Sequence, residues 1–304
     1  MAPASPRLHS RPPSYSFPLV IRTAFVLGAG LGTRLRPLTA RRPKPLIPIG
    51  GRPLIAHAFE HLLTLGVEHF VVNTHWCAER YAEFFPGGQW SGRRVTFVHE
   101  SPEVLETAGG IWHAREHLRH GPFAVYNGDI LCNLDLARAW AHHREAGNEV
   151  TLILRSHDGN RNVLFSDGRV LDLRRELQPD RLPGHLFTGI YLVEPAFIDR
   201  IPPAQKLSVV PVFHDMIRAG ANLGGIVLDE GDWRDLGTRD EYLAACAAAG
   251  SGLWIAPSAT VGEGAVVRDS IIWENAYVAP GAHLTRCVVT DGVHADGEHV
   301  DTDF

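Results

Sequence analysis

Short apolar runs rich in β-branched and aromatic residues alternate with segments of helical spacing from residue 22 to residue 154. The apolar runs, which we expect to be buried strands, lie at residues 23–27, 67–73, 95–99, 123–126 and 150–154. The segments that place apolar side chains on one helix face lie at residues 53–65, 109–118 and 136–145. Because a helix carries the chain back across the sheet, the strands that it connects run parallel. The sequence therefore predicts an α/β fold with a doubly wound, mostly parallel sheet, whose ligands bind beyond the carboxyl ends of the strands.

Two later segments depart from this alternation. Residues 162–165 and 169–173 flank a Ser166-Asp167-Gly168 turn signal, which predicts an inserted antiparallel hairpin. Beyond residue 250, aliphatic residues recur six apart between small and turn residues, as in the hexapeptide repeat of left-handed parallel β-helices. We expect residues 251–304 to form two to three coils of about 18 residues each, acting as a cap or an oligomerisation element.

The first 20 residues differ from the rest of the chain. They contain five prolines and four serines and show no helical periodicity. Such a segment buries too little apolar surface to offset the entropy of ordering it, so we expect a disordered leader. A transit peptide or a wrongly assigned start are the alternatives. The expected organisation is a leader at 1–20, a main domain at 21–250 and a β-helix tail at 251–304.

Composition narrows the class of protein. The 304 residues are 45% hydrophobic and 21% charged, with 29 basic and 34 acidic residues and a formal net charge of −5. These values are typical of a globular protein and argue against a nucleic-acid binder, which usually carries a basic excess. No apolar run is long enough to cross a membrane. The four cysteines lack the C-x-x-C spacing of a zinc or redox motif, so we expect a reduced, cytoplasmic protein.

Positive charge is concentrated near the beginning of the chain. No acidic residue precedes Glu60, whereas nine basic residues do. A basic segment on an acidic body indicates a local anion site, although a solvated basic stretch would give the same pattern. Directly after the first expected strand, residues 28–46 read GAGLGTRLRPLTARRPKPL. Glycines at the end of a strand can bring backbone N–H groups against phosphates.

This glycine loop matches neither of the two common phosphate-binding loops. Thr33 stands where the dinucleotide-binding fingerprint has its last glycine, and the Gly-Lys-Ser/Thr ending of the P-loop is absent. Instead, the loop is closed by Arg34 and followed by Lys44, which stands between Pro43 and Pro45. The two proline rings restrict the backbone on both sides of Lys44 and should aim its side chain. We interpret the segment as a phosphate site built from Arg34 and Lys44.

These motifs and those that follow resemble the sugar-1-phosphate nucleotidyltransferases, also called nucleotide-sugar pyrophosphorylases. The family signature is matched by Gly30, Gly32, Thr33, Arg34, Lys44 and Pro45. Further matches follow in order at residues 101–111, 126–130, 187–192, 205–211 and 233–238. The chain most resembles the mannose-1-phosphate guanylyltransferase and N-acetylmuramate-1-phosphate uridylyltransferase branches. The resemblance implies a Rossmann-like nucleotidyltransferase fold and a Mg²⁺-dependent reaction in which a nucleoside triphosphate and a sugar 1-phosphate give a nucleotide sugar and diphosphate.

The resemblance also implies roles for individual residues. Asp129 and Asp235 would hold Mg²⁺, which screens the phosphates and polarises the α-phosphate. The expected catalytic residues are Arg34, Lys44, Asp129 and Lys206, with Lys206 on the sugar phosphate. The residues expected at the nucleotide are Leu27, Gly28, Ala29, Gly30, Gly32, Thr33, Arg34, Lys44, Ser101, Glu106, Thr107 and Gly109. The residues expected at the sugar are Asn127, Asn162, Thr188, Gly189 and Lys206.

The base and the sugar stay open at this point. Ser101 and Glu106 stand where pyrimidine-specific members of the family carry a glutamine and a glycine. The hairpin region lacks a clear version of the family's Glu-Lys sugar motif. A mannose-1-phosphate guanylyltransferase is the preferred reading, and an N-acetylmuramate-1-phosphate uridylyltransferase is the alternative.

Two interpretations from other classes compete with this one. HAFEH at 57–61 and HAREH at 113–117 match the H-x-x-E-H zinc-peptidase motif, but chance matches are expected among 17 histidines, and apolar helix faces explain both segments. A catalytically silent sugar-nucleotide sensor, acting as a regulatory subunit, would have lost Arg34, Lys44 or a metal carboxylate, and this chain has all of them. Besides its substrates, the expected partner is a second copy of the chain bound through the tail.

Lysine is rare in this chain, because only Lys44 and Lys206 among the 29 basic residues are lysine. Both fall at expected phosphate contacts. The lysine ammonium is a compact point charge, whereas arginine carries a broad planar fork. We therefore expect that replacing either lysine by arginine impairs turnover.

Overall fold

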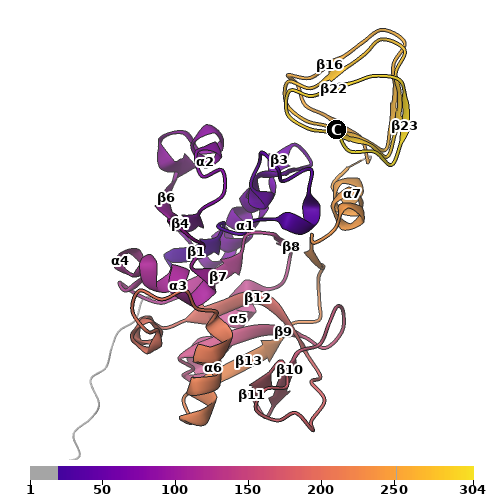
Figure 1. Ribbon diagram of the computed structural model, residues 1–304. Helices are drawn as coiled ribbons and strands as arrows, with labels where there is room; N and C mark the ends of the chain where they lie inside the picture. The colour runs from indigo at the N-terminus through magenta and orange to yellow at the C-terminus, as the bar shows by residue number, and fades with distance from the viewer. Residues whose placement is uncertain (1–19, 251) are drawn as a thin grey trace, which may run out of the picture.

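The computed structural model describes residues 20–250 and 252–304, so the expected leader at 1–20 lies almost wholly outside the described residues. Its centre is a ten-stranded sheet in the order β10-β11-β13-β9-β12-β7-β1-β4-β6-β5 (Figure 1). The strands are β1 (Thr23–Leu27), β4 (His69–Thr74), β5 (Gln89–Trp90), β6 (Arg93–His99), β7 (Phe123–Asn127), β9 (Val150–Arg155), β10 (Val163–Ser166), β11 (Arg169–Leu173), β12 (Leu186–Val193) and β13 (Leu223–Val227). Strands β6, β4, β1 and β7 are parallel neighbours, and β9 and β13 form a second parallel pair. The mostly parallel sheet predicted from the sequence is confirmed.

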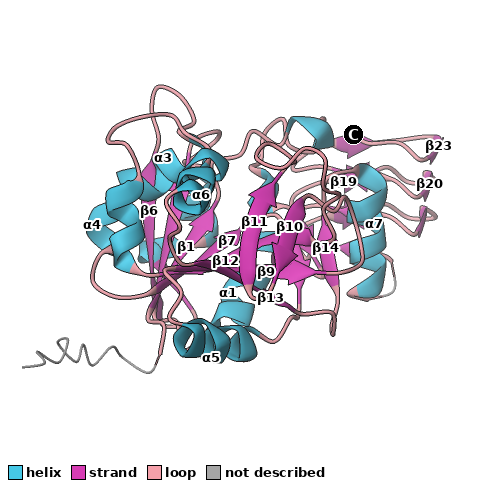
Figure 2. Cartoon of the chain, turned by 90° about the horizontal axis from the view of Figure 1, so that it is seen from below, coloured by secondary structure: helices cyan, strands magenta, loops and turns pink. Residues whose placement is uncertain are grey.

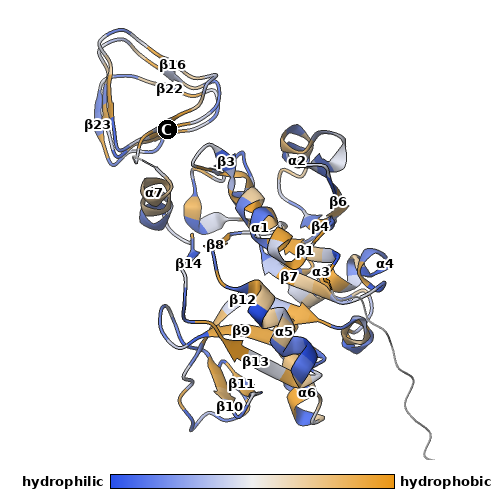
Figure 3. Ribbon diagram, turned by 180° about the vertical axis from the view of Figure 1, so that it is seen from behind, coloured by the Kyte–Doolittle hydropathy of each residue, from blue (hydrophilic) through white to orange (hydrophobic). Residues whose placement is uncertain are grey.

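Helices cover both faces of this sheet. The α-helices of the described residues are α1 (Leu54–Leu62), α2 (Arg80–Phe84), α3 (Glu106–His113), α4 (Arg115–Leu118), α5 (Leu136–Ala146), α6 (Val209–Arg218) and α7 (Arg239–Ala248), of which α7 packs away from this sheet, in a cluster with Trp273. Helices α1 and α5 pack on one face, and α3, α4 and α6 pack on the other, each over its own buried apolar cluster (Figure 2). Strands such as β9 and β12 are hydrophobic along their length because helices cover both of their faces (Figure 3). Among the described helices, none is long and apolar enough to cross a membrane.

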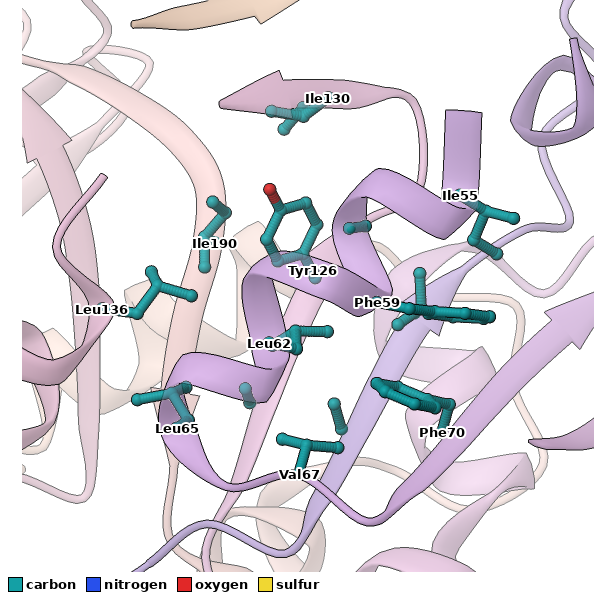
Figure 4. Packing of buried hydrophobic residues seen from close by; sticks show 14 of the residues in the cluster. Ile55, Phe59, Leu62, Leu65, Val67, Phe70, Tyr126, Ile130, Leu136 and Ile190 are labelled. Carbon is teal, nitrogen blue, oxygen red and sulfur yellow. The ribbon is translucent and has the colours of Figure 1, made fainter. Parts of the chain in front are cut away.

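Helix α1 shows how the predicted pattern produces the packing. Its apolar positions place Ile55, Phe59 and Leu62 against the sheet, and all three are fully buried (Figure 4). The ring of Phe59 stacks on Phe70 of β4 with 4.2 Å between the centroids. The last turn is a 3-10 turn, and Gly66 ends it with a φ of 84°, a conformation that glycine adopts without steric cost.

The predicted helix at 109–118 differs in detail, because it begins earlier and breaks. Helix α3 starts at Glu106, and Ala114, with φ −85° and ψ 2°, separates it from α4. A Cβ atom on Gly109 would lie 2.4 Å from the carbonyl oxygen of Gln205. The glycine is therefore needed for close approach to another backbone segment, which the helical periodicity did not reveal.

The hairpin predicted at 162–173 is present as β10 and β11, with Asp167 and Gly168 both at positive φ. It extends the edge of the main sheet, where Arg169 pairs with Gly224 of β13. Strand β12 was not predicted, and it lies antiparallel between β7 and β9. Gly189 sits at the bulge of β12 with a φ of 78°.

The tail is a short parallel β-helix whose coils stack as a triangle in Figure 1. Its three sheets hold β15 (Trp254–Ile255), β18 (Ile271–Ile272) and β21 (Val288–Val289); β16 (Thr260–Val261), β19 (Tyr277–Val278) and β22 (His294–Ala295); and β17 (Val266–Arg268), β20 (His283–Thr285) and β23 (Glu298–Val300). Trp254 pairs with Ile271, and Ile271 pairs with Val288, so one coil takes 17 residues. This coil is one residue shorter than the expected length, and the last pairing, His283 with Glu298, spans only 15 residues. Asp269 and Arg286 both take positive φ at the corner that precedes β18 and β21.

Candidate active site

The glycine loop after β1 forms one wall of a cavity of about 460 Å³. The 3-10 turn Thr33–Leu35 begins after Gly32, which has a φ of 60°, and the hydroxyl of Thr39 donates a 2.7 Å hydrogen bond to the Gly32 carbonyl. Of the residues predicted at the nucleotide, the ones that line this first cavity are Leu27, Ala29, Gly30, Gly32, Thr33, Arg34, Lys44, Glu106 and Thr107. The loop therefore faces a space, as expected of a loop that binds a phosphate ligand.

A second cavity of about 760 Å³ adjoins the first. Arg34, Thr107, Asn127 and Asp129 line both cavities. The predicted sugar residues Asn127, Asn162, Thr188 and Gly189 line the second one. Two ligands, one in each cavity, would meet at the shared residues.

Asp129 and Asp235 are brought together by a small two-stranded sheet. Strand β8 (Ile130–Cys132) follows Asp129 directly and pairs with β14 (Trp233–Asp235), with Asp235 opposite Ile130. The ammonium of Lys44 lies 2.7 Å from Oδ2 of Asp129 and 3.5 Å from Oδ1 of Asp235. Both carboxylates thus converge on one point, and the Lys44 side chain there is only 7% exposed.

This arrangement fits a divalent cation. One ammonium between two carboxylates leaves one negative charge uncompensated, and carboxylate oxygens are the ligands that Mg²⁺ prefers. In the part of the chain that the structure describes, no group of three or more His, Cys, Asp or Glu side chains gathers to hold a metal. A cation at Asp129 and Asp235 would therefore complete its coordination with water and with oxygens of a ligand.

Arg34 lies at the junction of the two cavities. A Cβ atom on Gly237 would be 2.6 Å from Nη1 of Arg34, so the glycine leaves the space that the guanidinium occupies. The Arg34 side chain is exposed, and it makes no ion pair within residues 20–250 and 252–304. Its charge is free to meet an anion.

A buried hydrogen-bond network ties the glycine loop to the loop that precedes α3. The backbone N–H of Gly28 donates to Oδ1 of Asn73 at 2.8 Å, and Nδ2 of Asn73 donates to Oε1 of Glu100 at 2.8 Å. The other oxygen of Glu100 accepts from the backbone N–H of Leu105 at 2.7 Å. Asn73 and Glu100, which are almost fully buried, were not predicted to serve the site. Polar residues at the ends of two adjacent parallel strands were the signal that could have indicated them.

Two of the predicted residues that line the second cavity, Thr188 and Gly189, help to shape its wall. The hydroxyl of Thr188 donates to the carbonyl of Ile153 at 2.8 Å, while its own carbonyl accepts from Nε1 of Trp233. A Cβ atom on Gly189 would lie 2.5 Å from Nδ2 of Asn127, so the glycine makes room for that amide. The second cavity is also lined by polar residues that were not predicted, namely Asp158, Asn160, Arg174 and Arg234.

Four predicted residues do not line either cavity. Gly28 and Gly109 lie beneath the walls, where they allow close approach of backbone segments. Ser101 is exposed outside both linings. Lys206 is also exposed, and its ammonium lies 2.9 Å from Oε2 of Glu103, a hydrogen bond that raises the pKa of Lys206.

Three of the four histidines in the two H-x-x-E-H segments make hydrogen bonds to the backbone, and the ring of the fourth, His117, packs against that of His69 with 6.0 Å between the centroids. Nε2 of His57 contacts the carbonyl of Ile49, and Nε2 of His61 contacts that of Leu134. In the second segment, Nε2 of His113 contacts the carbonyl of His99. Burial lowers the pKa of both His57 and His61. These contacts explain the histidines as parts of the fold.

Comparison with known proteins supports the resemblance to nucleotidyltransferases. The family model described as nucleotidyl transferase matches residues 23–251. Mannose-1-phosphate guanylyltransferase of Mycobacterium tuberculosis is 30% identical over 300 residues, which cover 90% of this chain and 81% of that protein. UTP–glucose-1-phosphate uridylyltransferase of a Synechocystis species is 31% identical, with coverages of 72% and 61%. The structure of UDP-glucose pyrophosphorylase from Acinetobacter baumanii superposes with a TM-score of 0.64 at 17% identity, covering 74% of this chain and 92% of that one.

Proposed function

Since this chain belongs to the nucleotidyl transferase family and is a sugar-1-phosphate nucleotidyltransferase, we propose that it forms GDP-mannose and diphosphate from GTP and mannose 1-phosphate. The observation that carries the reaction is the pair of adjoining cavities that share Arg34, Thr107, Asn127 and Asp129. The choice of substrates is supported by the relative that matches along 90% of the chain, which is named for this activity.

The reaction is a displacement at the α-phosphorus of the triphosphate. An oxygen of the sugar phosphate attacks in line, and diphosphate leaves from the opposite side. Because the attacking phosphate is already ionised, the site needs no general base. Its task is to hold two anions together and to stabilise the charge that moves to the leaving group.

Arg34 and Lys44 supply the fixed positive charge for this task. Lys44 is nearly buried, so its interaction with a phosphate is less weakened by water than that of a surface lysine. Arg34 lies where the two cavities join and can donate several hydrogen bonds to the transferred phosphate or to the diphosphate. Asn127 and the backbone at Gly189 would orient the sugar beside them.

Asp129 and Asp235 would hold Mg²⁺, for which their converging oxygens provide a suitable donor set. Bound there, the ion would screen the two phosphates and polarise the α-phosphate. Lys44 must then exchange at least part of its contact with the carboxylates for a contact with the triphosphate. The short tether between Pro43 and Pro45 limits that movement to the side chain.

A substrate matrix tests the proposal. The purified protein is incubated with Mg²⁺, each of GTP, UTP, ATP, CTP and dTTP, and each of mannose, glucose and N-acetylmuramic acid 1-phosphate, and diphosphate release is measured. We expect the highest kcat/KM with GTP and mannose 1-phosphate, and a kcat for this pair that is at least about 100-fold lower in Asp129→Ala. A preference for UTP with N-acetylmuramic acid 1-phosphate would overturn the substrate assignment. If no pair of substrates released diphosphate, the catalytic function would be refuted, and the alternative of a regulatory sugar-nucleotide sensor would be favoured.

We also propose that the tail joins two copies of the chain and that the enzyme works in the cytoplasm. Ile255, Val261 and Tyr277 of the tail are each more than a third exposed, so the tail offers apolar side chains that a second copy could cover. The four cysteines at 77, 132, 246 and 287 are free, in keeping with a reducing compartment. Light scattering at several concentrations should show a dimer or larger species that Val261→Glu dissociates, and a monomer throughout would refute the assembly.

A further inference from the structure

Arg42 is a buried charge at the contact between the tail and the glycine-loop region. It is 1% exposed, and its guanidinium lies between two aromatic rings, 5.0 Å from the centroid of Phe84 and 4.6 Å from that of Trp273. Nη2 donates to Oε2 of Glu274 at 2.7 Å, and the guanidinium also forms hydrogen bonds with both carboxylate oxygens of Asp291. Within the described residues, both carboxylates that pair with Arg42 belong to the tail.

The tail presents these two carboxylates by its coil repeat. Glu274 and Asp291 follow β18 and β21, which pair in register, so the two side chains occupy the same corner of consecutive coils. Burial and the neighbouring Glu274 raise the pKa of Asp291, against the opposing effect of Arg42. Two carboxylates stacked this closely repel each other, and Arg42 is the cation that compensates both. Asp291 also accepts from Arg80 of α2 at 2.8 Å.

The same part of the tail also contacts the chain just after residues 43–47, the segment that carries Lys44. Nε1 of Trp273 donates to the hydroxyl of Tyr242 in α7 at 3.1 Å, and that hydroxyl donates to the carbonyl of Pro48 at 3.0 Å. Trp273 therefore contacts Arg42, which precedes Lys44 in the chain. It also connects, by way of the Tyr242 hydroxyl, to Pro48, which follows Lys44. Leu236, which follows the second metal carboxylate, is fully buried in the apolar cluster that contains Trp273.

We propose that the β-helix tail is a positioning element of the active site, in which Arg42 fixes residues 43–47 so that the ammonium of Lys44 stays aligned with Asp129 and Asp235. A buried guanidinium without its carboxylates is costly, so loss of the tail contacts forces residues 41–43 to rearrange. The rearrangement passes to Lys44 because the proline on each side leaves the backbone little freedom to absorb it. The proposal rests on the proposed function of Lys44.

Matched variants separate this role from general stabilisation. Arg42→Gln removes the buried charge, and Glu274→Gln removes the negative charge of one of its two partners in the tail while keeping the shape of that side chain. Arg239→Gln is the control, because within the described residues the hydrogen bonds and ion pairs of Arg239 go to Asp301, to Asp303 and to the carbonyl of Arg286 in the tail, and not to residues 43–47. We expect both Arg42→Gln and Glu274→Gln to lower kcat about 10-fold to 100-fold, with KM for both substrates changed less than about 3-fold. Arg239→Gln should keep kcat within about 2-fold even if the protein melts earlier.

Two further measurements decide the mechanism. In a Lys44→Ala background, Arg42→Gln should change kcat less than about 2-fold, since positioning a missing ammonium has no effect. Equal losses in both backgrounds would overturn the proposal. Hydrogen exchange of peptides covering residues 41–48 should accelerate in Glu274→Gln and not in Arg239→Gln, and equal exchange in the two variants would also overturn it. The exchange result does not depend on turnover, so an inactive wild-type protein would count against the proposed function alone.

Discussion

Glu100→Gln tests whether the buried hydrogen-bond network of Asn73 and Glu100, behind the first cavity, holds the candidate site together. The substitution keeps the shape of a fully buried side chain and replaces one acceptor oxygen by an NH₂ donor. Glu100 accepts hydrogen bonds from Nδ2 of Asn73 and from the backbone of Leu105. The amide of Asn73 cannot turn over to accept from the introduced amide, because its own oxygen accepts from the backbone of Gly28. Every orientation of the two amides therefore leaves two donors facing each other.

The magnitude follows from this conflict. A hydrogen bond to a charged group contributes about 1.5–3 kcal/mol, and a buried donor without a partner costs about 1–3 kcal/mol. We expect Glu100→Gln to lower the free energy of unfolding by about 2–3 kcal/mol in urea titrations followed by circular dichroism. The glycine loop lines the first cavity together with Val104, Glu106 and Thr107, which flank Leu105, so KM for the triphosphate should rise about 10-fold, equivalent to about 1.4 kcal/mol.

Glu116→Gln provides the matched control for this prediction. Glu116 is an exposed side chain of α4 whose ion pairs lie at the surface. Its replacement should change the free energy of unfolding by less than about 0.5 kcal/mol. If Glu100→Gln is as stable as this control and keeps the wild-type KM, the hydrogen bonds of Glu100 do not hold the two loops, and the reasoning is refuted.

Three other outcomes are expected. Asp129→Ala and Asp235→Ala should each lower kcat by at least about 100-fold, because each removes one of two converging carboxylates. The circular dichroism spectrum of both variants should be unchanged, and near-normal turnover in either would contradict the metal assignment. Lys44→Arg should lower kcat by about 100-fold in steady-state assays, since the nearly buried space between the carboxylates fits an ammonium and not a planar fork; wild-type kinetics would count against it. Burial, with smaller effects of Arg94 and His117, lowers the pKa of His69 from 6.5 to about 4. Neutral His69 therefore contributes to the free energy of unfolding above pH 6.5, and this contribution is lost as the pH falls toward 4. Between pH 7 and pH 5, the urea midpoint of His69→Gln should therefore fall less than that of the wild type. An equal fall in both proteins would show that protonation of His69 is not the cause.

Much of the fold could be read from the sequence because its periodicity is local. The apolar run of β1 and the helical spacing of α1 are decided by residues a few positions apart, and Gly66 and the Asp167-Gly168 turn end elements by their own backbone preferences. The antiparallel strand β12 was missed because periodicity indicates a strand and not its neighbour. The early start of α3 and the break after it were missed for a related reason, since Gly109 lies close to the backbone of Gln205, almost a hundred residues away in the chain.

The candidate site divides in the same way. The sequence by itself indicated the glycine loop and the stiff segment around Lys44, because each is a short motif with its own backbone requirement, and the family resemblance pointed to the two carboxylates. Only the tertiary structure decided that Lys44 reaches both carboxylates, that Glu100 ties two loops together, and that Lys206 is paired outside the cavities. Arg42, one of nine basic residues in a seemingly solvated stretch, became a buried contact with the tail. The physical reason is that burial and charge pairing depend on which distant elements pack together, and no local pattern encodes that choice.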